Sequence, residues 1–206
     1  MSRRADPDRK PQLLAEIIDY LIDKPLSALT FRTLAEHLEV STFTLVYHFG
    51  TKNELIAEVV EAICARQERA FLEAQISTAT VDEFFDSFRT YWEWMLQPRN
   101  RQLQRLEFEA AMIESLNRSS TSATRKALER WHEVALNALL DLDVPADVAR
   151  AEARAMTNVV FGFQFDLIVL GDVEQVGEAF ERALRGARSR TRDMVAPRLH
   201  EVDVAP

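Results

Sequence analysis

Apolar side chains recur every three or four residues along most of the chain, and no stretch alternates apolar and polar residues as a strand does. The N-terminal part shows this spacing in three short segments. The first ends before Pro25, the second begins after Thr30, and the third begins after Ser41 and ends at Gly50. Thr and Ser are good N-caps and Gly is a common helix terminator, so three short helices are predicted.

Six longer segments with the same spacing follow, which brings the prediction to an all-α fold of about nine helices. The first of them runs from Thr51 to about Gln75 and begins with the spacing of a capping box. Signals for the starts and stops of the longer helices are Thr51 with Glu54, Thr80 with Glu83, Pro98, Pro145 and Gly171.

Composition indicates a soluble protein of a reducing compartment. Of the 206 residues 47% are hydrophobic, which is enough for a substantial core, and Cys64 is the one cysteine. No apolar run reaches the ~20 residues of a membrane span, and Met1-Ser2-Arg3-Arg4 lacks the apolar stretch of a signal peptide. We therefore expect a cytoplasmic protein with no membrane partner.

The net charge of −8 is distributed unevenly. Residues 1–52 hold seven basic and seven acidic side chains, so the whole negative excess lies after residue 52. An acidic surface is repelled by the phosphate backbone of DNA. The charge pattern therefore permits DNA binding at the N-terminal end without arguing for it.

The short helices predict a domain organisation. Two helices of about two turns are too small to be stable alone, so they need the first helix as a base. We expect a helix-turn-helix DNA-binding domain over residues 1–52, a helical effector-binding and dimerisation domain over 53–197, and a disordered tail over 198–206. The third helix would present Ser41, Thr42, Phe43 and Thr44 to the major groove.

One long motif runs without interruption from residue 30 to residue 55. It reads Thr30-x-x-x-Leu34-Ala35-x-x-Leu38-x-Val40-Ser41-x-x-Thr44-Leu45-x-x-His48-Phe49-x-x-Lys52-x-x-Leu55. Over about residues 10–60 the chain resembles the DNA-binding segment of the TetR family of repressors. The resemblance implies that Thr30 and Thr44 bind phosphates, that Lys52 pairs with another phosphate, and that His48 lies at the groove edge. The predicted DNA-binding residues are Thr30, Arg32, Ser41, Thr42, Phe43, Thr44, Tyr47, His48 and Lys52.

The sequence departs from the family pattern at two positions. Glu39 stands in the turn where the family usually has Gly, so it needs either a negative φ or a conformational cost. Val46 stands where the family usually has a tyrosine that touches a phosphate, and Tyr47 follows one residue later, about 100° around the helix. Our hypothesis is that Tyr47 contacts DNA from its own angle. The plainer interpretation of His48 and Phe49 is that they merely end a helix.

Aromatic residues crowd the predicted fifth helix and recur on its neighbours. Such residues are usually core, but the resemblance implies an apolar effector enclosed by the middle helices, here a hydrophobic, aromatic or lipid-like one. Polar groups also stand among the aromatics, at Tyr91, Glu107, His132, Asn158 and Gln164. Arg89, Arg105 or His132 could meet a polar end of the effector or face solvent. The predicted pocket comprises Phe71, Phe84, Phe88, Tyr91, Trp92, Met95, Phe108, Met112, Trp131, His132, Asn158, Phe161 and Phe165.

The last two helices predict a homodimer. The helix that follows Pro145 is apolar around most of its girth from Ala155 to Leu170, so it must be covered on two sides, and a partner chain would cover one of them. Small residues on both helices would allow close approach; they are Ala149, Ala153, Gly162, Ala179, Ala183 and Ala187. A two-fold pair spaces two recognition helices for a pseudo-palindromic operator.

These features favour a TetR-type transcriptional regulator, a repressor released by a hydrophobic effector, and activation remains open. By the resemblance, effector binding would tilt the helix from Thr51 to about Gln75, which we expect to be the only element running between the two sites. The alternative is a helical small-molecule-binding dimer that has lost DNA binding. An enzyme is disfavoured, and neither a cofactor nor a metal is expected. The four histidines share no metal-ligand spacing, and the chain has no Gly-rich phosphate loop.

Overall fold

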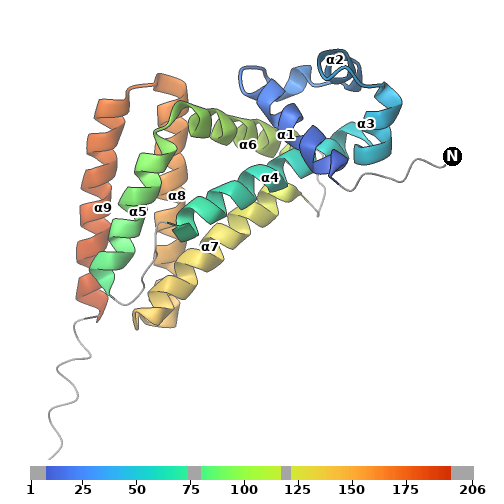
Figure 1. The fold of residues 1–206 in the computed structure, drawn as a ribbon. Coiled ribbons are helices and arrows are strands. Elements are labelled where there is room, and N and C mark those ends of the chain that lie inside the picture. The colour runs from blue at the N-terminus through green and yellow to red at the C-terminus, as the bar shows by residue number, and fades with distance from the viewer. Residues whose placement is uncertain (1–7, 74–79, 117–121, 196–206) are drawn as a thin grey trace, which may run out of the picture. The chain divides into compact units, whose positions relative to one another are not determined.

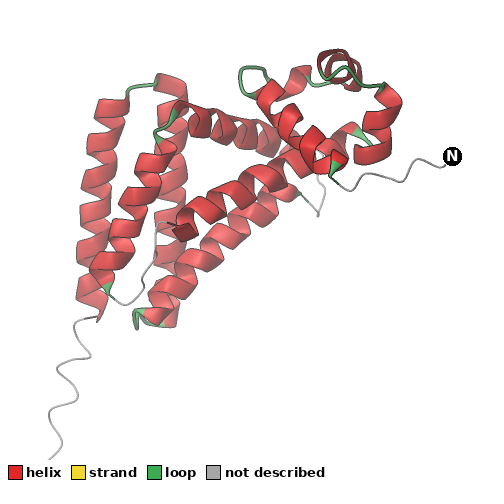
Figure 2. Cartoon of the chain, in the orientation of Figure 1, coloured by secondary structure: helices red, strands yellow, loops and turns green. Residues whose placement is uncertain are grey.

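The computed structural model describes residues 8–73, 80–116 and 122–195. Within these ranges the chain forms nine α-helices and one short 3-10 helix and contains no strand, as Figures 1 and 2 show. The helices are α1 (Arg9–Leu21), η1 (Leu26–Ala28), α2 (Phe31–His37), α3 (Thr42–Phe49), α4 (Lys52–Glu73), α5 (Val81–Met95), α6 (Pro98–Leu116), α7 (Ala123–Asp141), α8 (Ala146–Leu170) and α9 (Val173–Val195). The all-α prediction is confirmed, whereas the tail at 198–206 lies outside the described residues.

The helix starts follow the capping signals of the sequence. At α3 the backbone N–H of Thr44 donates to Ser41 Oγ over 3.0 Å. At α4 the capping box is complete, because the Thr51 N–H donates to the Glu54 carboxylate over 2.7 Å and the Glu54 N–H donates to Thr51 Oγ1 over 3.2 Å. The backbone N–H and hydroxyl of Thr51 hold the pKa of Glu54 below its ordinary value, so this carboxylate stays charged at neutral pH.

One compact unit contains the described residues of 1–65 and 102–126. In it α1 packs on α2 and α2 packs on α3. Leucine, isoleucine and phenylalanine side chains at helical spacing form its core, and the first part of α4 adds a further buried stripe. The fully or almost fully buried residues of α1–α3 are Leu13, Ile17, Leu21, Leu34, Leu45 and Phe49.

Within the same unit α6 holds the end of α1 and the turn after it. The Arg105 guanidinium donates to the carbonyl oxygens of Leu21, Ile22 and Lys24 over 3.1, 3.3 and 3.1 Å. Arg105 also pairs with Glu109, whose carboxylate accepts from the Leu26 N–H. The last carbonyls of a helix lack partners within the helix, so Arg105 satisfies groups that α1 itself cannot.

The second compact unit contains the described residues of 66–101 and 127–206. Its core is aromatic: the rings of Trp92 on α5 and Phe180 on α9 stack with centroids 4.3 Å apart and planes 11° from parallel. Phe84 and Phe85 are buried beside them in the same cluster. Helix α9 packs against both α5 and α8, which lie beside it in Figure 1. The crowding of aromatics on α5 is thus largely explained by core packing.

Ion pairs join the outer edges of α5 and α9. Arg89 forms a two-pronged pair with Glu181 over 2.8 and 3.1 Å, and Arg188 pairs with Asp86. The hydrogen bond from Arg89 holds the pKa of Glu181 below its ordinary value, and the bond from Arg188 does the same for the pKa of Asp86. Arg89 is therefore engaged with carboxylates and does not present its charge to an effector.

The two compact units do not divide at a single point of the chain. Helices α4, α6 and α7 each carry residues of both units. The expectation that α4 is the only continuous element is therefore wrong, because α6 and α7 share this property. A functional division between residues 52 and 53, into DNA reading and effector binding, stays a prediction.

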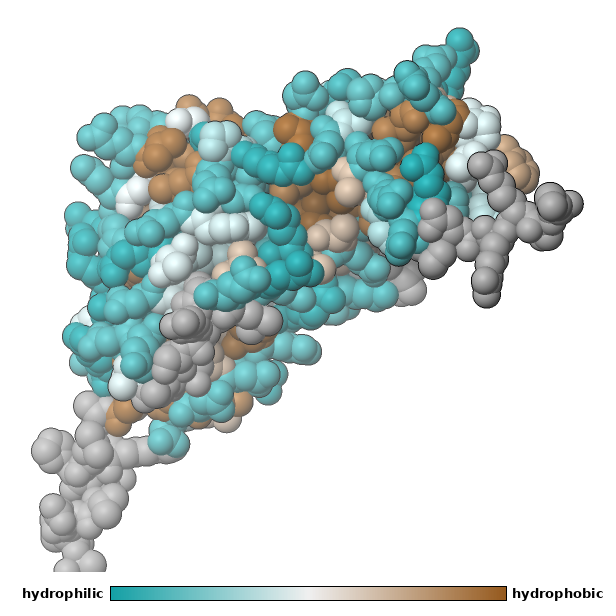
Figure 3. Space-filling view, in the orientation of Figure 1, coloured by the Kyte–Doolittle hydropathy of each residue, from teal (hydrophilic) through white to brown (hydrophobic). Residues whose placement is uncertain are grey.

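Helix α8 is the one described helix that is long and apolar enough to cross a membrane by length and composition. A core or interface helix of a soluble protein passes the same test. Its apolar residues are not fully covered within the chain: Phe165 is 56% exposed and Val169 60% exposed. On the face shown in Figure 3, hydrophilic residues cover most of the surface and hydrophobic residues gather in separate patches.

Candidate nucleic-acid interface and effector pocket

Helix α3 presents an exposed apolar stripe beside its buried face. Phe43, Val46 and Tyr47 are 77%, 47% and 67% exposed, while Leu45 and Phe49 are buried. Residues three and four apart lie on one side of a helix, so the exposed three form a single surface, here called the α3 stripe. Packing within the unit leaves this stripe uncovered, and grouped exposed apolar side chains mark an interaction site.

The N-terminal end of α3 carries hydroxyl groups. Ser41 and Thr42 are exposed and Thr44 is half-buried. The Ser41 and Thr44 hydroxyl oxygens lie 2.8 Å apart, and Ser41 also accepts from the Thr44 N–H. This arrangement fixes both hydroxyls at the helix start, where hydroxyl groups and backbone N–H groups can bind phosphate or base edges.

Two further predicted DNA contacts lie on α2. Thr30 is exposed and caps α2, and its hydroxyl accepts from the Thr33 N–H over 3.1 Å. The Thr33 hydroxyl lies 3.0 Å from the Thr30 hydroxyl, so the pair forms a reciprocal cap. Arg32 is exposed and pairs with Glu36 one turn later. Such an exposed pair is weak and can be exchanged for a phosphate at little cost.

The remaining predicted contacts lie at the junction of α3 and α4. Lys52 is the first residue of α4, is exposed, and donates to the Ser27 carbonyl over 3.4 Å. His48 is half-buried, and its ring meets the Tyr47 ring edge to face with centroids 5.1 Å apart. A cation at the first residue of a helix is poorly placed for the helix dipole, so Lys52 gains from an external anion.

The turn between α2 and α3 has the backbone of a glycine turn. Glu39 has φ of 53°, in the left-handed region, and the Val40 N–H donates to the Ala35 carbonyl over 3.1 Å. This is the Schellman arrangement at the end of α2, with Glu39 at the position that Gly normally occupies. Of the two possibilities raised by the sequence, the conformational cost is the one that the structure shows.

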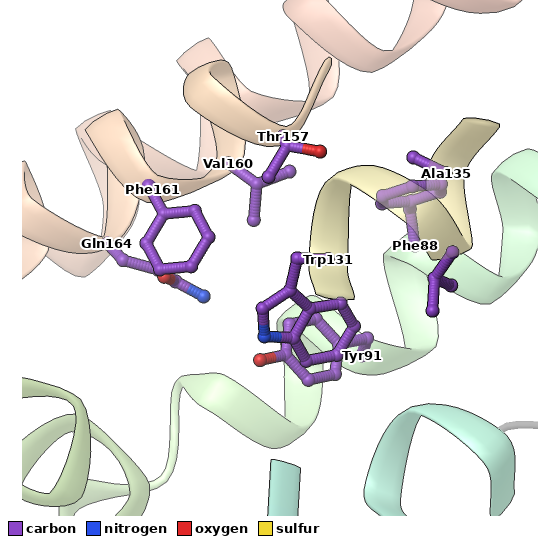
Figure 4. A pocket seen from close by; sticks show the side chains of 9 residues that line it. Phe88, Tyr91, Trp131, Ala135, Thr157, Val160, Phe161 and Gln164 are labelled. Carbon is purple, nitrogen blue, oxygen red and sulfur yellow. The ribbon is translucent and has the colours of Figure 1, made fainter. Parts of the chain in front are cut away.

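A cavity opens in the second unit between α5, α7 and α8. It encloses about 410 Å³ of empty space, part of it open to solvent. Aromatic rings dominate the wall, and Figure 4 shows Tyr91 and Trp131 together at one side of the cavity, with Phe161 and Gln164 across from them. The lining residues are Phe88, Tyr91, Trp131, Val134, Ala135, Thr157, Val160, Phe161 and Gln164.

The wall offers few polar atoms. The Tyr91 and Trp131 rings lie 5.7 Å apart at 47°, and the Thr157 hydroxyl donates to the Ala153 carbonyl over 2.9 Å. Gln164 is 2% exposed, and its Oε1 has no hydrogen-bond partner within the described part of the chain. A mostly apolar cavity with few oriented polar groups is the usual form of a small-molecule site.

The family model described as bacterial regulatory proteins, tetR family, matches residues 13–59. This match covers the caps, the turn at Glu39 and the α3 stripe. Residues 13–59 form a tetR-family helix-turn-helix domain. The resemblance stated from the sequence is thereby confirmed, while a search of the curated proteins found no match.

Solved structures agree with this assignment over nearly the whole chain. A TetR transcriptional regulator from Legionella pneumophila aligns with a TM-score of 0.64 and 16% identity, covering 94% of this chain and 98% of that one. The multidrug binding protein EbrR, complexed with imidazole, gives 0.64 and 20%, covering 86% and 95%. A TetR variant from Acinetobacter baumannii, in complex with minocycline, gives 0.58 and 20%, covering 94% and 99%. The chain therefore has a TetR-like fold.

The predicted DNA-binding residues of this TetR-like chain all reach the surface at least in part. Thr44 and His48 are half-buried, and the other seven are exposed: Thr30, Arg32, Ser41, Thr42, Phe43, Tyr47 and Lys52. Val46 and Tyr47 are both exposed and share one stripe with Phe43. Tyr47 is therefore accessible from its own angle, and its contact with DNA stays a prediction.

The predicted pocket residues separate into several groups. Four line the cavity: Phe88, Tyr91, Trp131 and Phe161. Phe84, Trp92 and Met95 are buried in the core of the same unit, whereas Asn158 and Phe165 are exposed on α8. Phe108 and Met112 lie on α6 in the other compact unit, as does the buried Glu107. The side chain of Phe71 lies outside the described part of the structure.

The remaining candidates for a polar end of the effector stand apart from the wall of this cavity. His132 is half-buried, and its Nε2 is buried without a hydrogen-bond partner among the described residues. Arg105 binds the carbonyls at the end of α1. Four lining residues were not predicted: Val134, Ala135, Thr157 and Val160. Helical spacing from Trp131 and Phe161 could have found them, since each lies one to four residues from one of these aromatics.

Proposed function

We propose that this chain is a dimeric DNA-binding transcriptional regulator, a repressor that a hydrophobic small molecule releases from a pseudo-palindromic operator. Its site of action is the cytoplasm, where both DNA and effector are met. The α3 stripe is the observation that carries the proposal. Phe43 at 77% exposure is the most exposed phenylalanine in the part of the chain described, and it stands directly behind the Ser41 cap at the start of a tetR-family recognition helix.

The chemistry of the stripe suits the major groove. An apolar ring such as that of Phe43 can contact the thymine methyl group, and hydroxyl groups at Ser41 and Thr42 can bond to base edges or phosphates. Lys52 supplies a positive charge for the backbone. The mixture is that of a domain that positions itself through phosphates and discriminates through bases.

A dimer is supported by one exposed face of α8. Small or apolar side chains and one asparagine recur there at alternating spacings of four and three residues, which is the pattern of a helix seam. The exposed seam residues are Ala151, Ala155, Asn158, Gly162, Phe165 and Val169. A second copy of the chain would cover this seam, and α9 offers exposed Ala179 beside half-buried Gly186 for the same contact.

An effector site is supported by the cavity in the second unit, which is at the lower end of the usual size range of small-molecule pockets, about 300–1,000 Å³. Similar folds bind ligands: the EbrR structure holds imidazole and the Acinetobacter protein holds minocycline. Since α4, α6 and α7 carry residues of both units, each is a physical route from effector to recognition helix. Coupling of this kind must be reciprocal, so operator DNA would weaken effector binding.

The experiment is selection of random duplex DNA by the purified full chain, followed by sequencing over several rounds. We expect an inverted repeat to be enriched. Its affinity should then fall steeply with salt, because displaced phosphate counterions are released. No enrichment by a folded dimer would overturn the repressor proposal.

Variants make this test specific to the α3 stripe. Phe43→Ala should relax base preference and reduce operator affinity by about tenfold or more, the usual effect of losing a base contact. Lys52→Gln should weaken all sequences and lower the salt slope by about 1 for each site lost. Tyr47→Phe and Tyr47→Ala test the tyrosine; unchanged affinity and base preference in both would remove it from the contact set. Met112→Ala, at a 65% exposed position on α6, is the matched control and should change neither quantity.

The second candidate function is a helical ligand-binding dimer that no longer binds DNA. Val46 at the usual tyrosine position and the strained Glu39 favour it. Effector binding without salt-dependent DNA affinity would identify this alternative.

A further inference from the structure

Gln164 is the polar side chain of the cavity wall whose hydrogen-bonding capacity is unmet. It lies on α8, is 2% exposed, and its Oε1 finds no partner among the described residues. Figure 4 shows its carboxamide beside Phe161, turned toward the cavity and the Tyr91–Trp131 side. A buried carboxamide oxygen without a partner destabilises the fold unless something else satisfies it.

The other wall residues do not take this role. The Thr157 hydroxyl already donates to the Ala153 carbonyl over 2.9 Å. Tyr91 and Trp131 carry polar atoms, yet neither bonds to Oε1 of Gln164. Phe88, Val134, Ala135, Val160 and Phe161 offer no polar side-chain atom, so the satisfaction of Gln164 falls to a bound molecule.

The wall also determines the charge and shape of that molecule. None of the nine lining residues carries an ionised side chain at neutral pH, so an anion or cation would lose its hydration without a counter-charge. The Tyr91 and Trp131 rings, 5.7 Å apart and inclined at 47°, make an aromatic corner against which a flat ring can pack.

We propose that Gln164 is the specificity-determining residue of this cavity, and that it selects uncharged, planar, mostly apolar molecules bearing one hydrogen-bond donor, which Oε1 accepts. The proposal rests on the cavity being the effector site of the proposed function. It adds what that function leaves open, namely the chemical class of the effector and the residue that recognises it.

The test uses three naphthalene probes that differ at one substituent. 2-Naphthol is neutral and has an O–H donor, 2-methoxynaphthalene has no donor, and 2-naphthoate is an anion. Binding of each to the full chain is measured by calorimetry in the absence of DNA. We expect 2-naphthol to bind about fivefold or more tightly than 2-methoxynaphthalene, as one added buried hydrogen bond implies. 2-Naphthoate should bind least.

Gln164→Met keeps the length of the side chain and removes its polar atoms. In this variant the preference for 2-naphthol should fall to within about twofold, because the accepting oxygen is gone. The unfolding midpoint of the unliganded protein should rise, since an unpaired buried group has been removed. Gln12→Met, at an exposed position of α1, is the matched control and should keep the preference of the original chain.

Three outcomes would overturn the proposal: an unchanged 2-naphthol preference in Gln164→Met, tightest binding by 2-naphthoate, or no binding of any probe below millimolar concentration. Failure of the repressor proposal looks different. In that case the probes discriminate as expected, but no inverted repeat is enriched or the selected DNA is not released.

Discussion

Glu39 occupies a left-handed backbone conformation, with φ of 53°, in the turn before the recognition helix. For a residue with a Cβ this conformation costs about 1–2 kcal/mol, whereas glycine adopts it readily. Asp143 has a similar φ of 63°, but aspartate tolerates this region better than glutamate. The strain at Glu39 is therefore the clearer of the two.

We predict that Glu39→Gly raises the free energy of unfolding by about 0.5–1 kcal/mol, the relief of strain being partly offset by the freer unfolded chain. Chemical denaturation of the two proteins measures this difference. Glu39→Ala is the control, because alanine keeps the Cβ and should gain little. A Glu39→Gly protein no more stable than Glu39→Ala would show that φ is not the source of strain.

At the scale of elements, α6 anchors the end of α1 through Arg105. The guanidinium reaches three backbone carbonyls, and Glu109 on the same helix accepts from the turn that follows. Arg105→Gln should lower the free energy of unfolding by about 2 kcal/mol, since hydrogen bonds to charged groups contribute about 1.5–3 kcal/mol. Thermal or urea unfolding provides the measurement.

The control for Arg105 is Arg69→Gln, which removes a guanidinium from an exposed position of α4. Equal small losses in both variants would mean that Arg105 acts as an ordinary surface charge. If the helix-turn-helix depends on this anchor, Arg105→Gln should also lose DNA affinity, and Arg69→Gln should keep it.

Glu114 near the end of α6 caps the start of α7. Its carboxylate accepts from the Ser122 and Thr124 hydroxyls and from the N–H groups of Ala123 and Thr124. Burial alone would raise the pKa of Glu114, but these bonds outweigh it and hold the pKa below the ordinary value of 4.5. The group is thus ionised in the folded protein over a wider pH range than in the unfolded chain.

A lowered folded pKa makes this contribution dependent on pH in one direction. It is present above the unfolded pKa of about 4.5 and is lost as pH falls through the lower folded value. Glu114→Gln should therefore cost stability at pH 7, and the gap from the original chain should shrink below about pH 4. Urea unfolding across pH 3–7 tests this sign, and a gap that widens toward acid would contradict it.

At the scale of the whole molecule, Gly162 distinguishes a monomer from a dimer. It lies in the middle of α8, is exposed, and a Cβ added to it would meet nothing within 4 Å in the chain. Glycine inside a helix costs about 0.8–1.0 kcal/mol relative to alanine, so the fold of one chain does not account for it. Close approach of a second chain at the seam would account for it.

We predict that Gly162→Ala stabilises the single chain by up to about 1 kcal/mol yet weakens the dimer, and that Gly162→Leu abolishes the dimer. Sedimentation equilibrium measures the second effect and denaturation at high dilution the first. Gly177→Ala on α9, where a Cβ also meets nothing within 4 Å, should stabilise the chain without changing its association. A Gly162→Ala dimer of unchanged affinity would place the seam outside the interface.

Much of the fold and of the DNA-facing site follows from the sequence alone, because these features depend on neighbouring residues. Thr30 and Ser41 start helices, Gly50 and Gly171 end them, and Thr51 with Glu54 forms the expected capping box. Each of these relations spans only a few residues, so it is visible in a short window. The family motif has the same local character.

The tertiary structure alone decided which residues form the cavity and which cover other surfaces. Helix α8 is apolar on almost every side, so its periodicity could not tell the wall of the cavity from the seam. Packing placed Gln164 inside, and left Asn158 and Phe165 exposed. Arg105 likewise binds carbonyls more than 80 residues away in the chain. Such partners depend on how helices pack, which side-chain patterns along one helix do not specify.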